Sequence, residues 1–281
     1  MPTANVTTNW EATETLLSGQ RYKPLYRWKE ALLRRFSWLS AVFAYNKYYR
    51  EQWIKANARE VPAGSRVIDV GAGSCPYRSL FSHCEYVAHD IGKLEDHQLQ
   101  GRRGYGKLEL VSDINAIPVE SGSFDVVLCT EVIEHVPEPI KAVAEMGRML
   151  KAGGRLLLSA PLRSALHQMP YHYYAGYTPS WYEKFLAQAG FTDIQVNPIC
   201  GVFQAYGEAT LYLALYLSPF SSASRWARAM FFPFWLISVP WLGLICPVLC
   251  SALDHLGMGK EFTLGYQVEA IKSVTPSQQT S

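Results

Sequence analysis

The sequence predicts an α/β fold in which a mostly parallel sheet carries helices on both faces. Short runs rich in β-branched residues alternate with helical runs along the middle of the chain, and this alternation is typical of parallel sheets. Glycines follow the first of these runs, and acidic residues follow the successive ones, which is the arrangement of a ligand-binding sheet edge. The 281 residues suffice for one such domain and an elaboration of about 100 residues.

A helical segment precedes the predicted sheet. Apolar residues lie near helical spacing from Arg27 to Arg59, and Pro62-Ala63-Gly64 ends the pattern. Lysine and arginine far outnumber glutamate in this segment, which is also rich in tryptophan and tyrosine. We therefore expect residues 1–60 to form a mobile tail followed by a basic, aromatic helical cap. The cap could cover a ligand cleft, join a membrane surface, or do both.

The elements of the sheet follow in order. Strands are expected at Arg66–Val70, Tyr86–His89, Phe124–Cys129, Arg155–Ala160, Thr192–Val196 and Phe262–Ile271. Helices are expected at Pro139–Leu150, with a glycine cap at Lys151 to Gly154, and at Pro179–Ala189. These elements assign residues 61–198 to the core of the domain and residues 261–273 to its last strand. Residues 274–281 are a polar tail.

A glycine loop follows the first predicted strand, in the segment RVIDVGAGSCPY. Glycines there let the backbone approach a ligand closely, and we expect a helix to begin directly after them. A dinucleotide site requires a third glycine where this chain has Pro76. Asp69 precedes the loop and would repel a phosphate, so the position suits a cationic ligand. The structural alternative is a tight turn without a ligand.

Two further acidic residues follow the next predicted strands. Asp90 ends the second strand, where a carboxylate can accept hydrogen bonds from both hydroxyls of a ribose. Asp113 can accept a hydrogen bond from an adenine amino group, with Ile114 packed on the ring. Taken singly, Asp90 could cap a helix and Asp113 could form an Asx-turn. Taken together, these carboxylates predict one ligand site at the carboxyl edge of the sheet.

The ordered segments VIDVGAG, HD, DINAIPVESGSFDVV, CTEVIEHV and MLKAGGRLLLSAP resemble the successive motifs of class I S-adenosylmethionine (SAM) methyltransferases of the type 11 family. The resemblance covers about Val67–Val196. It implies a Rossmann-like sheet of seven strands, the last two forming an antiparallel pair, and SAM as cofactor. The implied cofactor-binding residues are Asp69, Gly71, Ala72, Gly73, Asp90, Ile91, Asp113, Ile114, Thr130 and Glu131.

The resemblance also assigns parts of the cofactor to parts of the site. Asp69, Gly71 and Gly73 would hold the methionine part. Thr130 and Glu131 would line the floor near the sulfonium. The ribose and the adenine would lie at the two carboxylates described above.

Candidate residues for the methyl acceptor lie after the fourth and fifth strands. Transfer from SAM depends mainly on alignment, and a base is needed only for an acceptor such as a hydroxyl. The candidate bases are His135, His167 and His172, and the tyrosines that suit a sugar-like or phenolic acceptor are Tyr171, Tyr173, Tyr174 and Tyr177. The alternatives are a structural histidine and a packed aromatic loop. A related run occurs in type 11 members thought to act on glycans and cell-surface polymers.

Residues 199–260 predict a hydrophobic helical insertion before the last strand. Ala229–Leu253 carries no charged residue and is long enough to cross a bilayer, although three prolines should kink it. The chain must return to the same sheet, and the partner segment Ala209–Phe220 is too short to span. We therefore expect residues 209–253 to form an interfacial or re-entrant membrane element, with Trp226, Trp235, Trp241, Arg225 and Arg228 at the headgroups. A buried helical cap or a dimer interface is the alternative.

Other sequence features limit the class of protein. The net charge of +2 gives no support for nucleic-acid binding, and the six cysteines form no CxxC pair, so no metal site is expected. The polar N-terminus is unlike a signal peptide, which favours a cytoplasmic protein.

The expected function is SAM-dependent methylation, by SN2 transfer, of a small or a lipid- or glycan-linked acceptor, with a hydroxyl favoured. This would take place at the cytosolic face of a membrane. The alternatives are a soluble natural-product methyltransferase with an apolar acceptor pocket and a non-catalytic SAM-binding partner subunit. The sequence leaves the oligomeric state open.

Overall fold

The computed structural model describes residues 39–95, 104–217 and 225–274, together with positions 33, 35, 36, 98 and 99. The expectations for the mobile tail, for most of the cap before residue 39 and for the C-terminal tail after residue 274 lie outside these residues. So do those for the side chains of Arg225 and Arg228.

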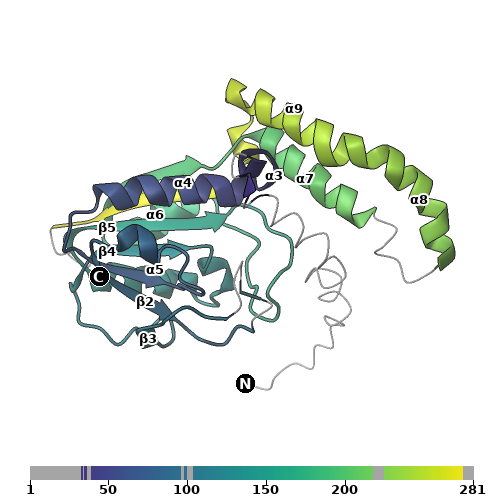
Figure 1. Cartoon of the computed structure of the whole chain (residues 1–281). Coiled ribbons are helices and arrows are strands. Elements are labelled where there is room, and N and C mark those ends of the chain that lie inside the picture. Colours follow the sequence, from purple (N-terminus) through teal and green to yellow (C-terminus); the bar gives the residue numbers. More distant parts are fainter. Residues whose placement is uncertain are drawn as a thin grey trace, which may run out of the picture.

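The described residues form one seven-stranded sheet, as the predicted fold class requires (Figure 1). Its strand order is β3-β2-β1-β4-β5-β7-β6. The strands are β1 (Arg66–Val70), β2 (Glu85–Asp90), β3 (Leu110–Val111), β4 (Phe124–Thr130), β5 (Leu150–Pro161), β6 (Phe191–Pro198) and β7 (Gly265–Lys272). Strands β1 to β5 pair in parallel, and β7 lies antiparallel between β5 and β6.

Helices cover both faces of the sheet. Helix α4 (Tyr45–Glu60) lies on one face, where Ile54 and Ala58 pack among side chains of β1, β4 and β5. Helices α5 (Pro139–Met149) and α6 (Pro179–Gln188) cover the other face and bury Met146 and Leu186. The two cores use alternate residues of the same strands because successive side chains in a strand point to opposite faces.

The helix expected after the glycine loop is not formed. The chain instead makes a short 3₁₀ turn, η2 (Arg78–Phe81), after Cys75, which has a φ of 53°. Pro76 has no N–H to donate, and the Cys75 N–H donates to the Ala72 carbonyl at 2.7 Å, so the loop closes as a tight turn.

The glycine cap predicted after α5 is also wrong. Leu150 is already extended and pairs with Phe124, so the helix ends at Met149. The following glycines belong to an irregular start of β5, in which Gly153 has a φ of 79°. The last strand begins at Gly265 rather than Phe262, because Lys260–Phe262 forms a 3₁₀ turn, η7.

The insertion forms a helical hairpin that projects beyond the sheet (Figure 1). Its first helix, α7 (Val202–Tyr216), begins earlier than the predicted segment Ala209–Phe220. The chain returns through α8 (Arg225–Pro240), the π-helical turn η5 (Trp241–Ile245) and α9 (Cys246–Leu253). Helix α3 (Ser40–Phe43) packs against α9.

The base of this hairpin is held to the domain by specific contacts. The Asp254 carboxylate follows α9 and accepts the backbone N–H groups of Gly201 (3.0 Å) and Gln204 (3.1 Å) at the start of α7. Such a carboxylate satisfies N–H groups that a helix leaves free at its first turn. The hairpin therefore leaves the sheet after β6 and rejoins it at β7.

Candidate functional site

One pocket of about 370 Å³ opens at the carboxyl ends of β1, β2 and β4. Further lining comes from α4 and from the segment after β2, through Arg50, Lys93, Leu94 and Leu99. All the residues expected to bind a cofactor line this pocket: Asp69, Gly71, Ala72, Gly73, Asp90, Ile91, Asp113, Ile114, Thr130 and Glu131.

The glycine loop is shaped by its conformation and by Asp90. Gly71 has a φ of 77°, and a Cβ added to it would overlap the Val132 side chain. The Asp90 carboxylate accepts the N–H groups of Gly73 and Gly92, each at 3.0 Å. Asp90 therefore joins the loops after β1 and β2 and still lines the pocket.

Asp69 is a buried carboxylate at the end of β1. It is 2% exposed and accepts a hydrogen bond from the Tyr86 hydroxyl. Burial raises the pKa of Asp69 to about 7, because removal from water disfavours the charged form. A cationic ligand would offset that penalty, whereas a phosphate would increase it.

Glu131 lies on the pocket floor after β4 and has a φ of 54°. Its Oε1 accepts a hydrogen bond from Ser159 at 2.9 Å. Its Oε2 accepts one from Asn46 at 3.3 Å and lies 3.4 Å from Arg50 Nη1. Two residues at the start of α4 thus hold the floor of the pocket.

Asp113 forms the Asx-turn that the sequence left open. Its Oδ1 accepts the Asn115 N–H at 2.8 Å, while Asp113 and Ile114 both line the pocket. The turn and a ligand role are compatible because a carboxylate has about four lone-pair sites.

The three candidate bases lie together, although they come from two separate loops. His135 ends the 3₁₀ turn η3 (Ile133–His135) and lines the pocket. Its ring centroid is 4.8 Å from that of His167 and 5.6 Å from that of His172. Burial lowers the pKa of His135 to about 3, so this imidazole is neutral at pH 7 and is a weak base.

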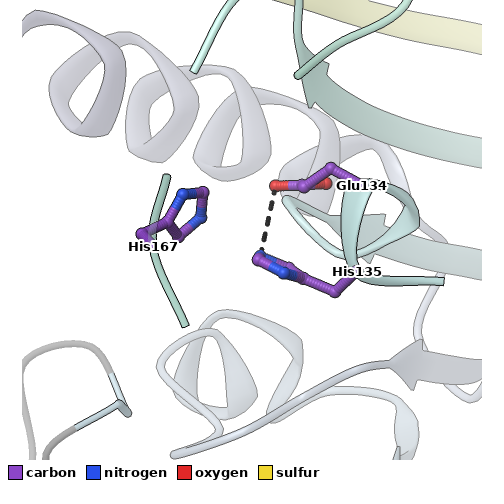
Figure 2. A group of neighbouring side chains, drawn as sticks. All are labelled: Glu134, His135 and His167. Atoms are coloured by element: carbon purple, nitrogen blue, oxygen red, sulfur yellow. Dashed lines mark ion pairs between the residues drawn. The ribbon is translucent and has the colours of Figure 1, made fainter. Parts of the chain in front are cut away.

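Glu134 adjoins this cluster and was missed at the level of sequence. Its side chain is 1% exposed, and its Oε1 lies 3.7 Å from His135 Nε2 (Figure 2). Burial raises the pKa of this carboxyl well above its usual value. The segment EVIEHV gave a signal, since it places an acidic residue and a histidine side by side after β4.

Only two of the four candidate tyrosines line the pocket. Tyr171 and Tyr173 line the pocket. Tyr174 and Tyr177 lie outside its lining, and their hydroxyls donate to the carbonyls of Pro137 (2.9 Å) and Ile133 (2.7 Å). Tyr177 is 4% exposed and belongs to the main core. Tyr177 thus fits the packed-loop alternative, whereas Tyr174 remains 38% exposed.

Residues 68–158 match the model of a family described as "Methyltransferase domain". The chain is 34% identical over 111 residues to a ubiquinone biosynthesis O-methyltransferase of Xanthomonas axonopodis pv. citri (strain 306), a match that covers 37% of this chain and 46% of that protein. A protein of the same name from Ralstonia nicotianae is 29% identical over 180 residues, covering 54% and 74%. The chain thus spans about half the length of the first of these relatives.

A similar solved structure is that of Haemonchus contortus phosphoethanolamine N-methyltransferase 2 in complex with S-adenosyl-L-methionine. It has a TM-score of 0.42 and 17% identity, covering 76% of this chain and 50% of that one. The family match lies on the segment that carries the glycine loop and the acidic strand ends. Residues 68–158 thus match a methyltransferase domain, in agreement with the resemblance of the motifs to class I methyltransferases of the type 11 family, whose cofactor is S-adenosylmethionine.

Proposed function

We propose that this protein is a SAM-dependent methyltransferase and that SAM binds in the pocket at the carboxyl edge of the sheet. The observation that carries the proposal is the convergence of four carboxylates on one pocket: Asp69, Asp90, Asp113 and Glu131. SAM carries an ammonium and a sulfonium and no phosphate, so such a pocket complements its charge.

Each end of the cofactor has a matching part of the pocket. Asp69 and the loop Gly71–Gly73 would bind the methionine end, and Asp90 with Ile91 would bind the ribose. Asp113 and Ile114 would bind the adenine. Thr130 and Glu131 would lie near the sulfonium, whose positive charge Glu131 suits.

SAM supplies a methyl group that is already activated by the positively charged sulfur. The residues of the chain therefore have to orient the acceptor in line with the C–S bond and to exclude water. His135, Tyr171 and Tyr173 line the pocket at the end that would receive the acceptor. His167 and His172 pack behind His135, where they would orient its ring.

Calorimetric titration of the full chain with SAM tests the cofactor site. We expect Asp69→Asn to weaken binding at least tenfold, or by about 1.4 kcal/mol, since it removes the buried charge. Asp193→Asn is the matched control, because Asp193 is exposed on β6 and does not line the pocket. A full chain that fails to bind SAM, or equal affinities in both variants, would contradict the proposal.

For the acceptor we propose a hydroxyl on a small or a lipid- or glycan-linked molecule. The aromatic lining of Tyr171 and Tyr173 supports a ring-bearing acceptor. The relatives named for ubiquinone biosynthesis are O-methyltransferases by name, which supports oxygen as the target atom. Formation of S-adenosylhomocysteine on incubation with phenolic, polyprenyl-linked and sugar acceptors tests this. A chain that binds SAM but methylates none of these classes would favour the partner-subunit alternative.

We further propose that the hairpin contacts the cytosolic face of a membrane. Ala229–Leu256 forms a continuous helical run of 28 residues, and an 18-residue window within it has a mean hydropathy of 2.1 and is only 17% buried. Trp226 is 87% exposed and Ile237 is 78% exposed. An apolar helix so poorly covered does not support the buried-cap alternative, and it matches an element whose partner is lipid or a second chain.

Liposome flotation separates those two partners. We expect the full chain to float with anionic vesicles and Ile237→Glu to reduce the bound fraction severalfold. Val274→Glu is the control, since Val274 is also 78% exposed but follows β7. A chain that stays unbound and sediments as a dimer, which Ile237→Glu dissociates, would show that the surface is a subunit interface.

A further inference from the structure

Glu134, His135 and His167 face one another beside the pocket, which His135 lines (Figure 2). Their nearest ligand atoms all lie within 4.8 Å of one another. We propose that these three side chains bind a divalent transition-metal ion, with Zn²⁺ as the best match to two imidazoles and one carboxylate.

The hydrogen bonds of the two histidines fix which nitrogen of each ring is free to coordinate. His135 Nδ1 lies 3.0 Å from the Tyr171 carbonyl oxygen, and His167 Nδ1 lies 2.9 Å from that of Ala165. A carbonyl oxygen can only accept, so each Nδ1 must carry the proton. In a neutral ring the Nε2 atom then presents a lone pair.

The carboxylate adds further acceptors to the same space. Glu134 Oε1 lies 3.7 Å from His135 Nε2, which is too long for a hydrogen bond. Glu134 Oε2 is buried and has no hydrogen-bond partner among the described residues. A buried carboxylate that faces lone pairs is costly unless a proton or a metal cation lies between them, and a metal cation can satisfy all three side chains at once.

Among the described residues, His172 adds a further unpaired acceptor to the cluster. Ser164 Oγ donates to the Ala175 carbonyl at 3.1 Å and lies 2.9 Å from His172 Nε2, so Nε2 must be the donor to Ser164. His172 Nδ1 is therefore an acceptor, and it is buried without a partner within the described part of the chain. The ring lies 4.5 Å from that of His167, so the cluster holds more lone pairs than protons.

The hydrogen bonds of the two histidines match those seen around metal-binding histidines. Histidines that bind metals donate their second ring N–H to a carbonyl or a carboxylate, as His135 and His167 both do. Zinc–ligand distances near 2.1 Å place tetrahedral ligands about 3.4 Å apart. The 3.7 Å between Glu134 Oε1 and His135 Nε2 is close to that value. His167 lies in the loop after β5, and a small inward movement of that loop would complete the set.

The ion would lie beside the pocket because His135 lines it. Three protein ligands leave a fourth position for an acceptor hydroxyl. Coordination lowers the pKa of such a group, so its proton is released to water more readily. The oxygen then forms a bond to the methyl carbon as the bond from that carbon to sulfur breaks. This chemical role rests on the proposed function, whereas metal binding itself does not.

Metal binding is measured on the full chain after treatment with a chelator, without SAM or acceptor. Zn²⁺ is titrated in competition with a chromophoric chelator, and we expect one ion per chain. His167→Ala should weaken binding on the order of 100-fold. His83→Ala is the control, because His83 is an exposed histidine whose Nε2 contacts the Val61 carbonyl (3.0 Å) outside the pocket. The absorption spectrum of the Co²⁺ complex gives a second readout. Coordination by imidazoles and a carboxylate should give no thiolate charge-transfer band, and such a band would show that a cysteine binds the metal instead.

Two results would overturn the proposal: no stoichiometric binding by the full chain, or affinities of the His167→Ala and His83→Ala variants that do not differ. The rise in melting temperature on addition of Zn²⁺ distinguishes loss of metal binding from a folding defect, because each variant is compared with itself without metal. Zn²⁺ should stabilise the unmodified chain but not Glu134→Gln, even if that variant is less stable without metal. SAM titration of the chelated protein is a separate measurement, so failure of the metal site leaves the cofactor site to be judged independently.

Discussion

The buried carboxylate of Asp69 makes the stability of the protein depend on pH in a direction that the structure defines. Burial raises its pKa from 3.8 to about 7. Between those two values the folded chain holds a proton that the unfolded chain releases, so stability falls as the pH rises. The full shift corresponds to a loss on the order of 4 kcal/mol, since one pKa unit is about 1.4 kcal/mol.

Asp69→Asn removes this titration and keeps an oxygen that can accept the Tyr86 hydroxyl. Without SAM, we expect the unfolding free energies of the variant and the unmodified chain to diverge from pH 5 to pH 8, with the variant more stable at pH 8. Urea denaturation at each pH measures the difference. Parallel profiles would refute the assignment of a protonated Asp69 at low pH.

The same carboxylate links SAM binding to proton release. A cation beside Asp69 favours its charged form and lowers its pKa, so binding below pH 7 should release a proton. Calorimetry in buffers of different ionisation enthalpy measures that proton. Binding heats that do not depend on the buffer at pH 6 would contradict the charge complementarity on which the proposed cofactor site depends.

Three other substitutions test separate parts of the structure. Gly71→Ala should weaken SAM binding more than tenfold, because its Cβ overlaps a valine side chain; Gly64→Ala, with a similar φ of 81° and open space, is the calorimetric control for strain alone. Tyr177→Phe should lower the free energy of unfolding by about 1 kcal/mol in urea denaturation and leave SAM affinity unchanged, because the Ile133 carbonyl still accepts the Val136 N–H. Asp254→Ala should cost about 1 kcal/mol and speed hydrogen exchange in the first turn of α7, and unchanged exchange would show that the cap is unimportant.

The cofactor pocket could be predicted from the sequence because its determinants are local. A glycine loop or an acidic residue at a strand end acquires its position from the strand that precedes it, and parallel strands end at one edge. Asp69 and Asp90 thus meet in space once β1 and β2 are paired. The two wrong predictions also concern single turns. The turn at Pro76 replaced the helix expected after the glycine loop, and the extended Leu150 replaced the glycine cap expected after α5.

Contacts between segments that are distant in the sequence could not be predicted from the sequence. Arg50 reaches Glu131 only because α4 lies across the sheet, and no spacing in the sequence encodes that pairing. Glu134 and His167 meet because the loop after β5 folds back on η3. The histidines were recognised as candidates one by one, but the hydrogen bonds that direct their free nitrogens toward one carboxylate are visible only in the fold.

Helix α4 connects the exposed hairpin to the pocket. At its first residue, the Tyr45 hydroxyl donates to the Pro247 carbonyl of α9 at 2.8 Å. Little more than one turn later, Arg50 pairs with Glu131 on the pocket floor. Because a helix rises about 1.5 Å per residue, these two contacts are separated by about 8 Å along α4. An acceptor with an apolar chain could therefore lie along α9, where Val248 and Leu249 are exposed, with its reactive end near the pocket. If the hairpin contacts a membrane as proposed, a lipid-linked acceptor held there would need only a short reach to the pocket floor.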